Sequence, residues 1–130
     1  MKHILIVDDD QIITIILAKM LSDEYSVTTK NSAISALEYL SNENYNEFDL
    51  ILLDYLMPSM NGLEFLEKLK EKDIIIPSIL LTSSKDQNVI LNACKLGCFD
   101  FIDKTAELDN IKEIIKSTLE LSKIADELKE

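Results

Sequence analysis

The sequence predicts an α/β domain built on a five-stranded parallel sheet that helices cover on both faces, a doubly wound (βα)5 arrangement. Five short apolar runs alternate along the chain with segments whose apolar residues recur at helical spacing. The runs are apolar throughout, which is typical of strands that are buried on both faces of a sheet. Strands that alternate with helices form parallel sheets with right-handed crossovers. We therefore expect one domain of five strand–helix units.

The strands are expected at residues 4–7, 27–29, 50–53, 79–81 and 99–102. After a first helix over residues 12–21, four more helices are predicted near residues 33–40, 63–69 and 89–94, and from residue 108 onward. Apolar residues recur in these segments at helical spacing. Asp10 is expected to cap the first helix, and the fourth is expected to stop at Gly97. The first helix follows from six apolar residues on one helical stripe: Ile12, Ile13, Ile16, Leu17, Met20 and Leu21.

The composition excludes several classes of protein. The 130 residues include 24 Asp and Glu against 13 Lys and no Arg, which gives a net charge of −11. A chain this acidic lacks the basic surface that nucleic acids require, and it is unsuited to anionic membrane surfaces. It contains no secretory signal segment and no apolar run near the roughly 18 residues that suggest a membrane span. We therefore expect a cytoplasmic protein.

The two cysteines are expected to be ordinary core side chains. Cys94 and Cys98 would need further cysteine or histidine ligands to bind a metal, and the chain has one histidine, His3. A disulfide is not expected in a reducing compartment. Because unpaired cysteine behaves as a small hydrophobic residue, we predict that both side chains are buried.

The end of the chain carries a weak coiled-coil pattern. Residues 111, 118 and 125 form one seven-residue series, and residues 114, 121 and 128 form a second series three residues on. One interpretation is an amphipathic helix that closes the domain and ends in a polar tip. The other is a helix that continues into a partner domain or a homodimer. We divide the chain into a main domain over 1–118 and a helical extension over 119–130 that could link to a further domain.

Polar side chains follow four of the five predicted strands. In open parallel sheets, ligands bind beside the carboxyl ends of the strands. Carboxylates gathered there repel one another unless a cation lies among them, and oxygen ligands without Cys or His suit Mg²⁺ or Mn²⁺. In chain order the residues at these ends are Asp8 and Asp9, Asp54, Thr82 and Lys104.

The groups other than the carboxylate pair indicate phosphoryl chemistry. The Lys104 ammonium and the Thr82 hydroxyl place positive charge and a hydrogen-bond donor beside the expected cation. Together they suit a phosphoryl group, whose oxygens need neutralising on several sides. Asp54 follows an apolar strand that would hold it rigidly. A carboxylate so placed can act as a nucleophile toward phosphorus and form an acyl phosphate.

In these residues the sequence resembles the receiver domains of two-component response regulators, from about residue 2 to residue 116. The resemblance implies a flavodoxin-like fold with strand order 2-1-3-4-5, so that residues 1–118 would be a receiver domain and 119–130 a C-terminal helix extension that could link to an output domain. As an ordered set the motifs are highly specific. They are Ile6-Val7-Asp8-Asp9-Asp10, Leu52-Leu53-Asp54-Tyr55-Leu56-Met57-Pro58, Met60-Asn61-Gly62, Leu80-Leu81-Thr82-Ser83 and Phe101-Ile102-Asp103-Lys104.

The resemblance implies a role for each acidic group. Asp54 would be the phosphoacceptor. Asp8 and Asp9 would position Mg²⁺ together with Asp54 and the backbone carbonyl of Leu56, and Mn²⁺ could take the same place.

The resemblance implies a switch as well. Thr82 would hydrogen-bond the phosphoryl group, and Lys104 would pair with it. In relatives the threonine moves toward the phosphoryl group, and an aromatic side chain swings inward into the space released. Phe101 occupies that aromatic position here.

Two positions depart from the family pattern. Phe101 stands where relatives often have tyrosine, so a switch at this residue would lack a hydroxyl and would act through packing. Thr105 follows Lys104 where the family usually has proline. A cis peptide bond before a residue other than proline costs roughly 3–4 kcal/mol, so we expect a trans bond at this place.

Partners and activity are implied by the same resemblance. A histidine kinase or a histidine phosphotransfer protein would donate the phosphoryl group. The domain would catalyse much of the transfer itself and slowly hydrolyse the product, but it would act mainly as a signalling switch. The fourth helix, fifth strand and fifth helix would present the altered surface to an output domain or partner protein. Direct nucleic-acid binding is not expected.

Three other interpretations fit less of the pattern. A phosphatase of the haloacid-dehalogenase type would use Asp8 as nucleophile and Asp10 as acid–base. It also needs an acidic motif after the lysine, and it would leave Asp54 without a role. A pseudo-receiver would keep the fold as an interaction module without phosphorylation, yet all five pocket groups are present. A flavodoxin-type flavin carrier would need a phosphate-binding Ser/Thr/Gly loop where the first strand leads into acids.

Overall fold

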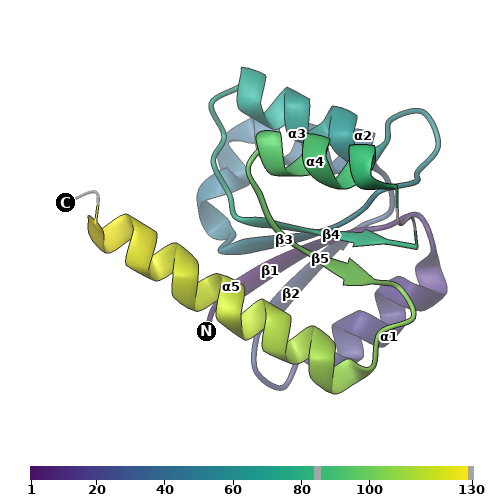
Figure 1. The fold of residues 1–130 in the computed structure, drawn as a ribbon, viewed down its shortest axis with the longest axis vertical. Coiled ribbons are helices and arrows are strands. Elements are labelled where there is room, and N and C mark those ends of the chain that lie inside the picture. The colour runs from purple at the N-terminus through teal and green to yellow at the C-terminus, as the bar shows by residue number, and fades with distance from the viewer. Residues whose placement is uncertain (84–85, 129–130) are drawn as a thin grey trace.

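The computed structural model describes residues 1–83 and 86–128 and contains a five-stranded sheet (Figure 1). The strands run in the order β2-β1-β3-β4-β5, and every neighbouring pair is parallel. The predicted strand order is confirmed. Each observed strand extends beyond its predicted range by at most one residue at either end. The strands are β1 (His3–Val7), β2 (Ser26–Lys30), β3 (Leu50–Asp54), β4 (Ser78–Thr82) and β5 (Cys98–Asp103).

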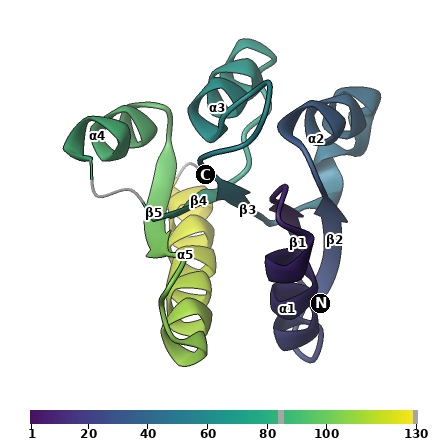
Figure 2. The same cartoon turned by 90° about the vertical axis from the view of Figure 1, so that its right-hand side faces the viewer.

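Helices cover both faces of the sheet, as Figure 2 shows. One face carries α1 (Gln11–Leu21) and α5 (Leu108–Leu128). The other face carries α2 (Ala33–Tyr39), α3 (Gly62–Glu71) and α4 (Gln87–Lys95). A π-helical segment η1 (Leu40–Asn44) and a 3-10 turn η2 (Tyr45–Glu47) lead from α2 toward β3. The doubly wound (βα)5 class is therefore confirmed.

Two layers of buried side chains hold the helices to the sheet. Successive residues of a strand point to opposite faces, so neighbours such as Leu5 and Ile6 belong to different layers. This explains why the central strands are apolar throughout. The layer under α2, α3 and α4 includes Leu5, Val7, Ile51, Leu53, Phe65 and Leu80. The layer under α1 and α5 includes Ile4, Ile6, Leu17, Leu52, Ile111 and Ile115.

Two side-chain caps fix the helices that follow β1 and β3. The Asp10 carboxylate accepts hydrogen bonds from the backbone N–H groups of Ile12 and Ile13 at 3.0 and 3.3 Å, which confirms the predicted cap. Asn61 and Glu64 form a capping box at the start of α3, where each side chain accepts from the other's backbone N–H, at 2.9 and 3.1 Å. Each cap stabilises its helix by about 1 kcal/mol. Together they hold the first turns of α1 and α3 beside the carboxyl edge of the sheet.

α1 buries fewer apolar residues than its sequence pattern suggests. Leu17 and Leu21 are buried, whereas Ile12 and Ile16 are 71% and 51% exposed. A helix turns about 100° per residue, so Ile12 lies about 180° around the axis from Leu21, and Ile16 about 100° from Leu17. The stripe of six residues therefore spans more of the helix than one face of the sheet can cover. As a result, α1 presents apolar side chains to solvent.

The two cysteines differ in their surroundings. Cys98 is buried at the start of β5, where its thiol donates to the backbone carbonyls of Asp100 and Ser78 at 3.1 and 3.4 Å. Burial raises the pKa of the Cys98 thiol to about 11. Cys94 is exposed on α4, so the prediction that both side chains are buried is wrong for this residue. Its neighbour Ala93 faces the core, and Cys94 is turned about 100° away from it.

α5 is one unbroken helix of 21 residues that runs across the predicted boundary between residues 118 and 119. Ile111 and Thr118 are buried against the domain, whereas Leu121 and Leu128 are exposed. Figure 1 shows the last turns of α5 extending past the rest of the domain. Residues 129–130, at the end of the predicted extension, lie outside the described residues. None of the described helices is long and apolar enough to cross a membrane.

Candidate functional site

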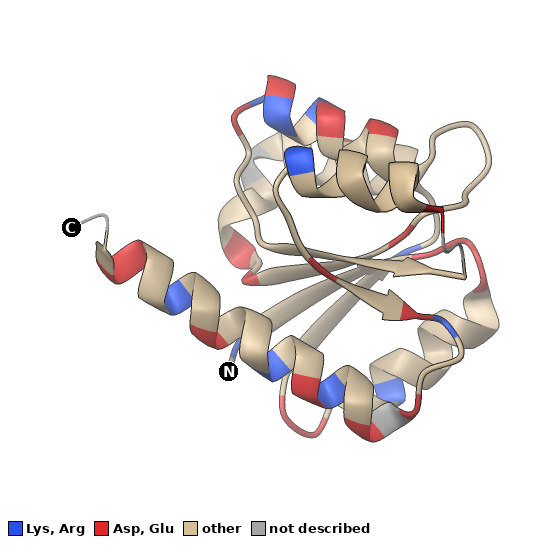
Figure 3. Ribbon diagram, in the orientation of Figure 1, with Lys and Arg blue, Asp and Glu red and all other residues tan. Residues whose placement is uncertain are grey.

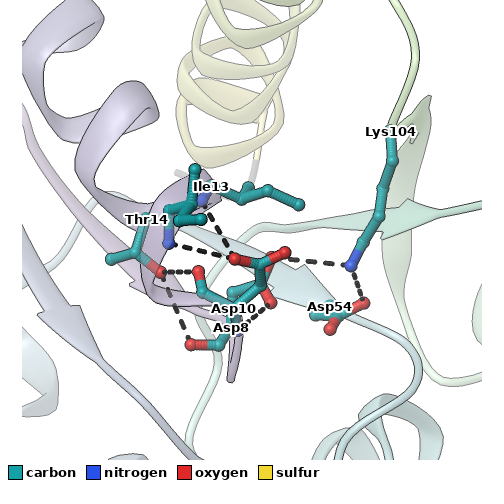
Figure 4. A network of polar contacts seen from close by, with 7 residues as sticks. Asp8, Asp10, Ile13, Thr14, Asp54 and Lys104 are labelled. Carbon is teal, nitrogen blue, oxygen red and sulfur yellow. Dashed lines mark hydrogen bonds and ion pairs between the residues drawn. The ribbon is translucent and has the colours of Figure 1, made fainter.

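The carboxyl edge of the sheet brings the predicted polar residues together. Asp8 follows β1, Asp54 ends β3, and Thr82 ends β4. The parallel register pairs Thr82 with Asp103, the last residue of β5, which is followed directly by Lys104. Figure 4 shows the side chains of Asp8, Asp54 and Lys104 pointing toward one another.

Lys104 links two buried carboxylates. Its Nζ lies 2.8 Å from Oδ1 of Asp54 and 3.6 Å from Oδ2 of Asp8. Asp8 and Asp54 are almost completely buried, whereas the lysine side chain is 22% exposed and reaches them from the rim. The backbone N–H of Lys104 donates to the carbonyl of Thr82 at 3.3 Å, which anchors the lysine beside β4. Burial opposes the ammonium charge, but the hydrogen bond and charge of Asp54 outweigh it and raise the pKa of Lys104.

Asp9 adds a third carboxylate to this pair. Asp8, Asp9 and Asp54 each offer an oxygen within 4.8 Å of the others. The backbone N–H of Asp10 donates to Oδ1 of Asp8 at 2.9 Å, but the buried Oδ2 atoms of Asp8 and Asp54 accept no hydrogen bond from a described residue. Buried carboxylate oxygens are normally hydrogen-bonded, and three carboxylates against one ammonium leave two formal negative charges. This all-oxygen donor set fits Mg²⁺ or Mn²⁺.

Burial raises the pKa of Asp54 to about 7. The Lys104 hydrogen bond acts in the opposite direction, and the neighbouring Asp8 adds to the rise. In the absence of a cation, Asp54 is therefore only partly ionised near neutral pH. A divalent cation among the carboxylates would favour the charged form and lower this pKa.

The raised pKa of Asp54 predicts a pH dependence of stability. With a chelator present, the Asp54→Asn variant should gain stability relative to the wild-type chain as the pH rises from 5 to 8. A carboxyl group whose pKa is higher in the folded than in the unfolded chain stabilises the fold at low pH, and this contribution is lost as the pH rises through about 7. In urea unfolding, the free energy of unfolding of Asp54→Asn relative to that of the wild-type chain should increase by about 1–3 kcal/mol between pH 5 and pH 8. A difference that stays constant over this range would contradict the raised pKa.

Gly62 lies where the loop after β3 returns to the strand. Its backbone N–H donates to the carbonyl of Tyr55 at 2.8 Å. A Cβ atom at this position would lie 2.7 Å from the carbonyl oxygen of Asp54 and 3.1 Å from the Cα atom of Tyr55. A side chain therefore cannot fit here unless the backbone that carries Asp54 moves. The sequence predicts a turn at Gly62, one of only two glycines, but this close approach is visible only in the folded chain.

We expect the Gly62→Ala variant to lose about 2–4 kcal/mol of unfolding free energy, since the clash is with backbone atoms that cannot rotate away. Gly97→Ala is the matched control. Gly97 has a φ of 92° and open space around it, so alanine there adds only backbone strain of roughly 1–2 kcal/mol. Urea unfolding of both variants measures the difference, and a greater loss in Gly97→Ala would contradict the packing argument.

The other predicted site residues lie around this centre. Thr82 is buried, and Phe101 on β5 is half-buried against the core layer under α2, α3 and α4. The side chain of Leu56, two residues after Asp54, is 66% exposed, so any contribution to the site comes from its backbone. The described residues contain no cis peptide bond, which confirms the trans bond between Lys104 and Thr105.

Curated proteins share this sequence pattern over most of the chain. The chain is 37% identical over 123 residues to two-component response regulator ARR10 of Arabidopsis thaliana. The aligned segment covers 94% of this chain and 22% of that protein. It is 36% identical over 105 residues to response regulator SaeR of Staphylococcus aureus. This aligned segment covers 80% of this chain and 44% of that protein. The chain therefore spans less than half the length of these relatives.

Solved structures and a family model agree with these relatives. A CheY-like response regulator receiver domain protein from Methanospirillum hungatei superposes with a TM-score of 0.87 at 28% identity, over 96% of this chain and 98% of that chain. A response regulator receiver domain protein from Clostridium thermocellum gives a TM-score of 0.85 at 25% identity, over 96% of this chain and 99% of that chain. The model of the response regulator receiver domain matches residues 4–116. With a parallel sheet in the order 2-1-3-4-5, this chain belongs to the response regulator receiver domain family.

Proposed function

We propose that the chain is a phosphorylatable receiver that accepts a phosphoryl group on Asp54 and changes its surface in response. The observation that carries this proposal is the buried Asp54 carboxylate, 2.8 Å from the Lys104 ammonium and clustered with Asp8 and Asp9. Buried charges of one sign oppose folding, so such a cluster is better explained by chemistry than by stability. The donor would be the phosphohistidine of a kinase or of a phosphotransfer protein.

In the proposed reaction, an oxygen of Asp54 attacks the phosphorus atom. The bond between phosphorus and the donor nitrogen breaks, and its electron pair leaves with the donor. Asp8, Asp9 and Asp54 would hold Mg²⁺ or Mn²⁺, which when bound supplies positive charge that neutralises phosphoryl oxygens. Lys104, which now pairs with Asp54, would pair with a phosphoryl oxygen, and the Thr82 hydroxyl would donate to another. The domain would thus catalyse much of the transfer itself and slowly hydrolyse its own acyl phosphate.

The switch would start from the same two residues. A new anionic group on Asp54 would attract the Thr82 hydroxyl and the Lys104 ammonium. Phe101 lies on the strand that pairs with β4 and is half-buried, so a shift of Thr82 would change the space available to its ring. We place the resulting change on the face formed by α4, β5 and α5, where an output domain or partner protein would detect it.

The exposed isoleucines of α1 support a protein as the phosphoryl donor. Ile12, Ile15 and Ile16 are at least half exposed, and they lie on the helix that starts next to the carboxylates. Clustered apolar side chains on a surface are typical of sites where another protein binds. The donor protein would cover these side chains while its phosphohistidine reaches Asp54.

Incubation with acetyl phosphate and Mg²⁺ tests the proposal. We expect the mass to rise by one phosphoryl group, and peptide mapping should place the modification on Asp54. A chain that stays unmodified would overturn the proposal and would favour a pseudo-receiver. Modification of Asp8 would favour a haloacid-dehalogenase-type reaction, although the carboxylate of Asp10, the acid–base group of that reaction, is engaged in capping α1.

A further inference from the structure

The last turns of α5 carry an apolar stripe on their surface. Leu121, Ile124 and Leu128 are 59%, 51% and 82% exposed. At about 100° per residue, the three side chains lie within about 60° of one another around the helix axis. The half-buried Ile114 continues the stripe toward the domain. The three exposed residues lie beyond residue 116, where the family match ends.

The stripe differs from the coiled-coil pattern predicted from the sequence. Ile111 and Thr118, which belong to the first seven-residue series, are buried against the domain and are closed to any partner. The exposed apolar stripe instead combines Leu121 and Leu128 of the second series with Ile124, three residues after Leu121. This stripe has the spacing of the contact face of a coiled coil.

A row of glutamates borders the stripe. Glu113, Glu120 and Glu127 recur every seven residues, and each directly precedes a member of the second series. All three are exposed, and none forms an ion pair with a described residue. Figure 3 shows acidic and basic segments along α5. Around the helix axis, the glutamate row lies between the apolar stripe and the lysines of α5. By helical spacing, these lysines are Lys112, Lys116 and Lys123.

The glutamate row makes a second copy of the chain a poor partner. In an antiparallel pair of α5 helices, the row of one helix would face the row of the other. In a parallel pair, each row would face the side of the helix that carries Thr118 and Ala125, which offer no positive charge. The net charge of −11 adds repulsion between copies. Lysine or arginine beside an apolar seam would complement the row.

The domain offers further apolar surface next to the stripe. Phe99 on β5 is 45% exposed, and together with Ser122 and Ala125 it lines a cavity of about 540 Å³ at the amino edge of the sheet. Ser122 and Ala125 contribute small side chains to the α5 side of this cavity. A large apolar side chain of a bound helix could therefore reach beyond α5 to Phe99.

We propose that the last turns of α5 bind an amphipathic helix of another protein. The apolar face of that helix covers Leu121, Ile124 and Leu128, and its lysine or arginine side chains pair with Glu120 and Glu127. The surface lies near the amino edge of the sheet, opposite the edge that carries Asp54. Peptide binding is measured on the unphosphorylated chain, so either proposal can fail without the other.

Two designed helical peptides of about three heptads serve as probes. Both carry Leu and Ile at the seam positions. One has Lys at the flanking positions, and the other has Glu. Calorimetric titration of the full, unphosphorylated chain should show at least about tenfold tighter binding of the lysine peptide, with an affinity that falls as salt is added.

Replacing the stripe separates a specific surface from general attraction to an acidic protein. The Leu121→Gln, Ile124→Gln, Leu128→Gln triple variant keeps every charge of the chain, so non-specific attraction remains. It should nevertheless bind the lysine peptide at least about tenfold more weakly. The matched control, Ile34→Gln, replaces an exposed isoleucine of α2, on the opposite face of the sheet from α5, and should bind as the wild-type chain does.

Replacing the glutamates tests the charge preference. Glu120→Lys combined with Glu127→Lys should weaken binding of the lysine peptide and strengthen binding of the glutamate peptide. Glu38→Lys combined with Glu67→Lys changes the net charge equally at exposed sites and should leave the preference unchanged. Three results would overturn the proposal. They are equal binding of both peptides, undiminished binding by the triple variant, and a sedimentation mass of a dimer that the triple variant returns to a monomer.

Discussion

The Asp54→Asn variant is expected to take up no phosphoryl group from acetyl phosphate under conditions that modify the wild-type chain. Asparagine matches aspartate in size, and its carbonyl can still accept a hydrogen bond from Lys104, so the pocket should keep its shape. The amide, however, is neutral and a poor nucleophile, so no acyl phosphate can form. Intact-mass spectrometry over a time course measures the modified fraction directly.

Asp73→Asn is the matched control for this loss. Asp73 is exposed in the turn after α3, and its φ of 56° is a backbone conformation that asparagine adopts as readily as aspartate. This variant should be modified at the wild-type rate. An adduct on Asp54→Asn would show that another carboxylate is the acceptor. A loss of the adduct in both variants would mean that the effect is not specific to Asp54.

The fold class could be predicted because the central strands are buried on both faces. β1, β3 and β4 contain almost no exposed residue, and this leaves apolar runs that differ clearly from the helical segments between them. Periodicity alone could not say which strands are neighbours, and the strand order came from the family resemblance. The pairing of β1 with both β2 and β3 depends on contacts between segments far apart in the sequence.

Burial of single side chains on helices was harder to predict. An apolar stripe shows that a helix packs on something, but the part of its surface that is covered depends on the neighbouring elements. Ile12 and Ile16 are exposed on α1 for this reason, and Cys94 is exposed on α4 although Ala93 beside it is buried. The same limit applies to α5, where Thr118 is buried and the more apolar part of the pattern is open.

The members of the candidate site could be predicted from their place in the chain. The carboxyl ends of parallel strands meet at one edge, so residues directly after apolar strands, such as Asp8 and Asp54, had to lie near one another. Their energetics could not be predicted, because burial and hydrogen bonding depend on the surrounding structure. The buried oxygens that accept no hydrogen bond from a described residue, the pKa of Asp54 near 7 and the approach of Gly62 to the Asp54 backbone are visible only in the structure.

Asp9→Asn is expected to weaken Mg²⁺ binding by at least about tenfold, because the affinity of an oxygen-ligand site follows the number of charged ligands. Asp9 is the exposed member of the carboxylate cluster, so this change removes a charge without disturbing the core. Calorimetric titration with Mg²⁺ measures the affinity. A second readout is stability, since Mg²⁺ at ten times its dissociation constant adds about 1.4 kcal/mol to the free energy of unfolding.

Asp10→Asn provides the control, because it removes the same charge one residue further along the chain. The Asp10 side chain caps α1, and asparagine caps a helix about as well as aspartate, so the fold should be unaffected. We expect this variant to bind Mg²⁺ as the wild-type chain does. If both variants lost affinity equally, Mg²⁺ would be attracted only by the general negative charge of this edge. A difference between them would show that particular carboxylates coordinate the ion, because the two variants have the same net charge.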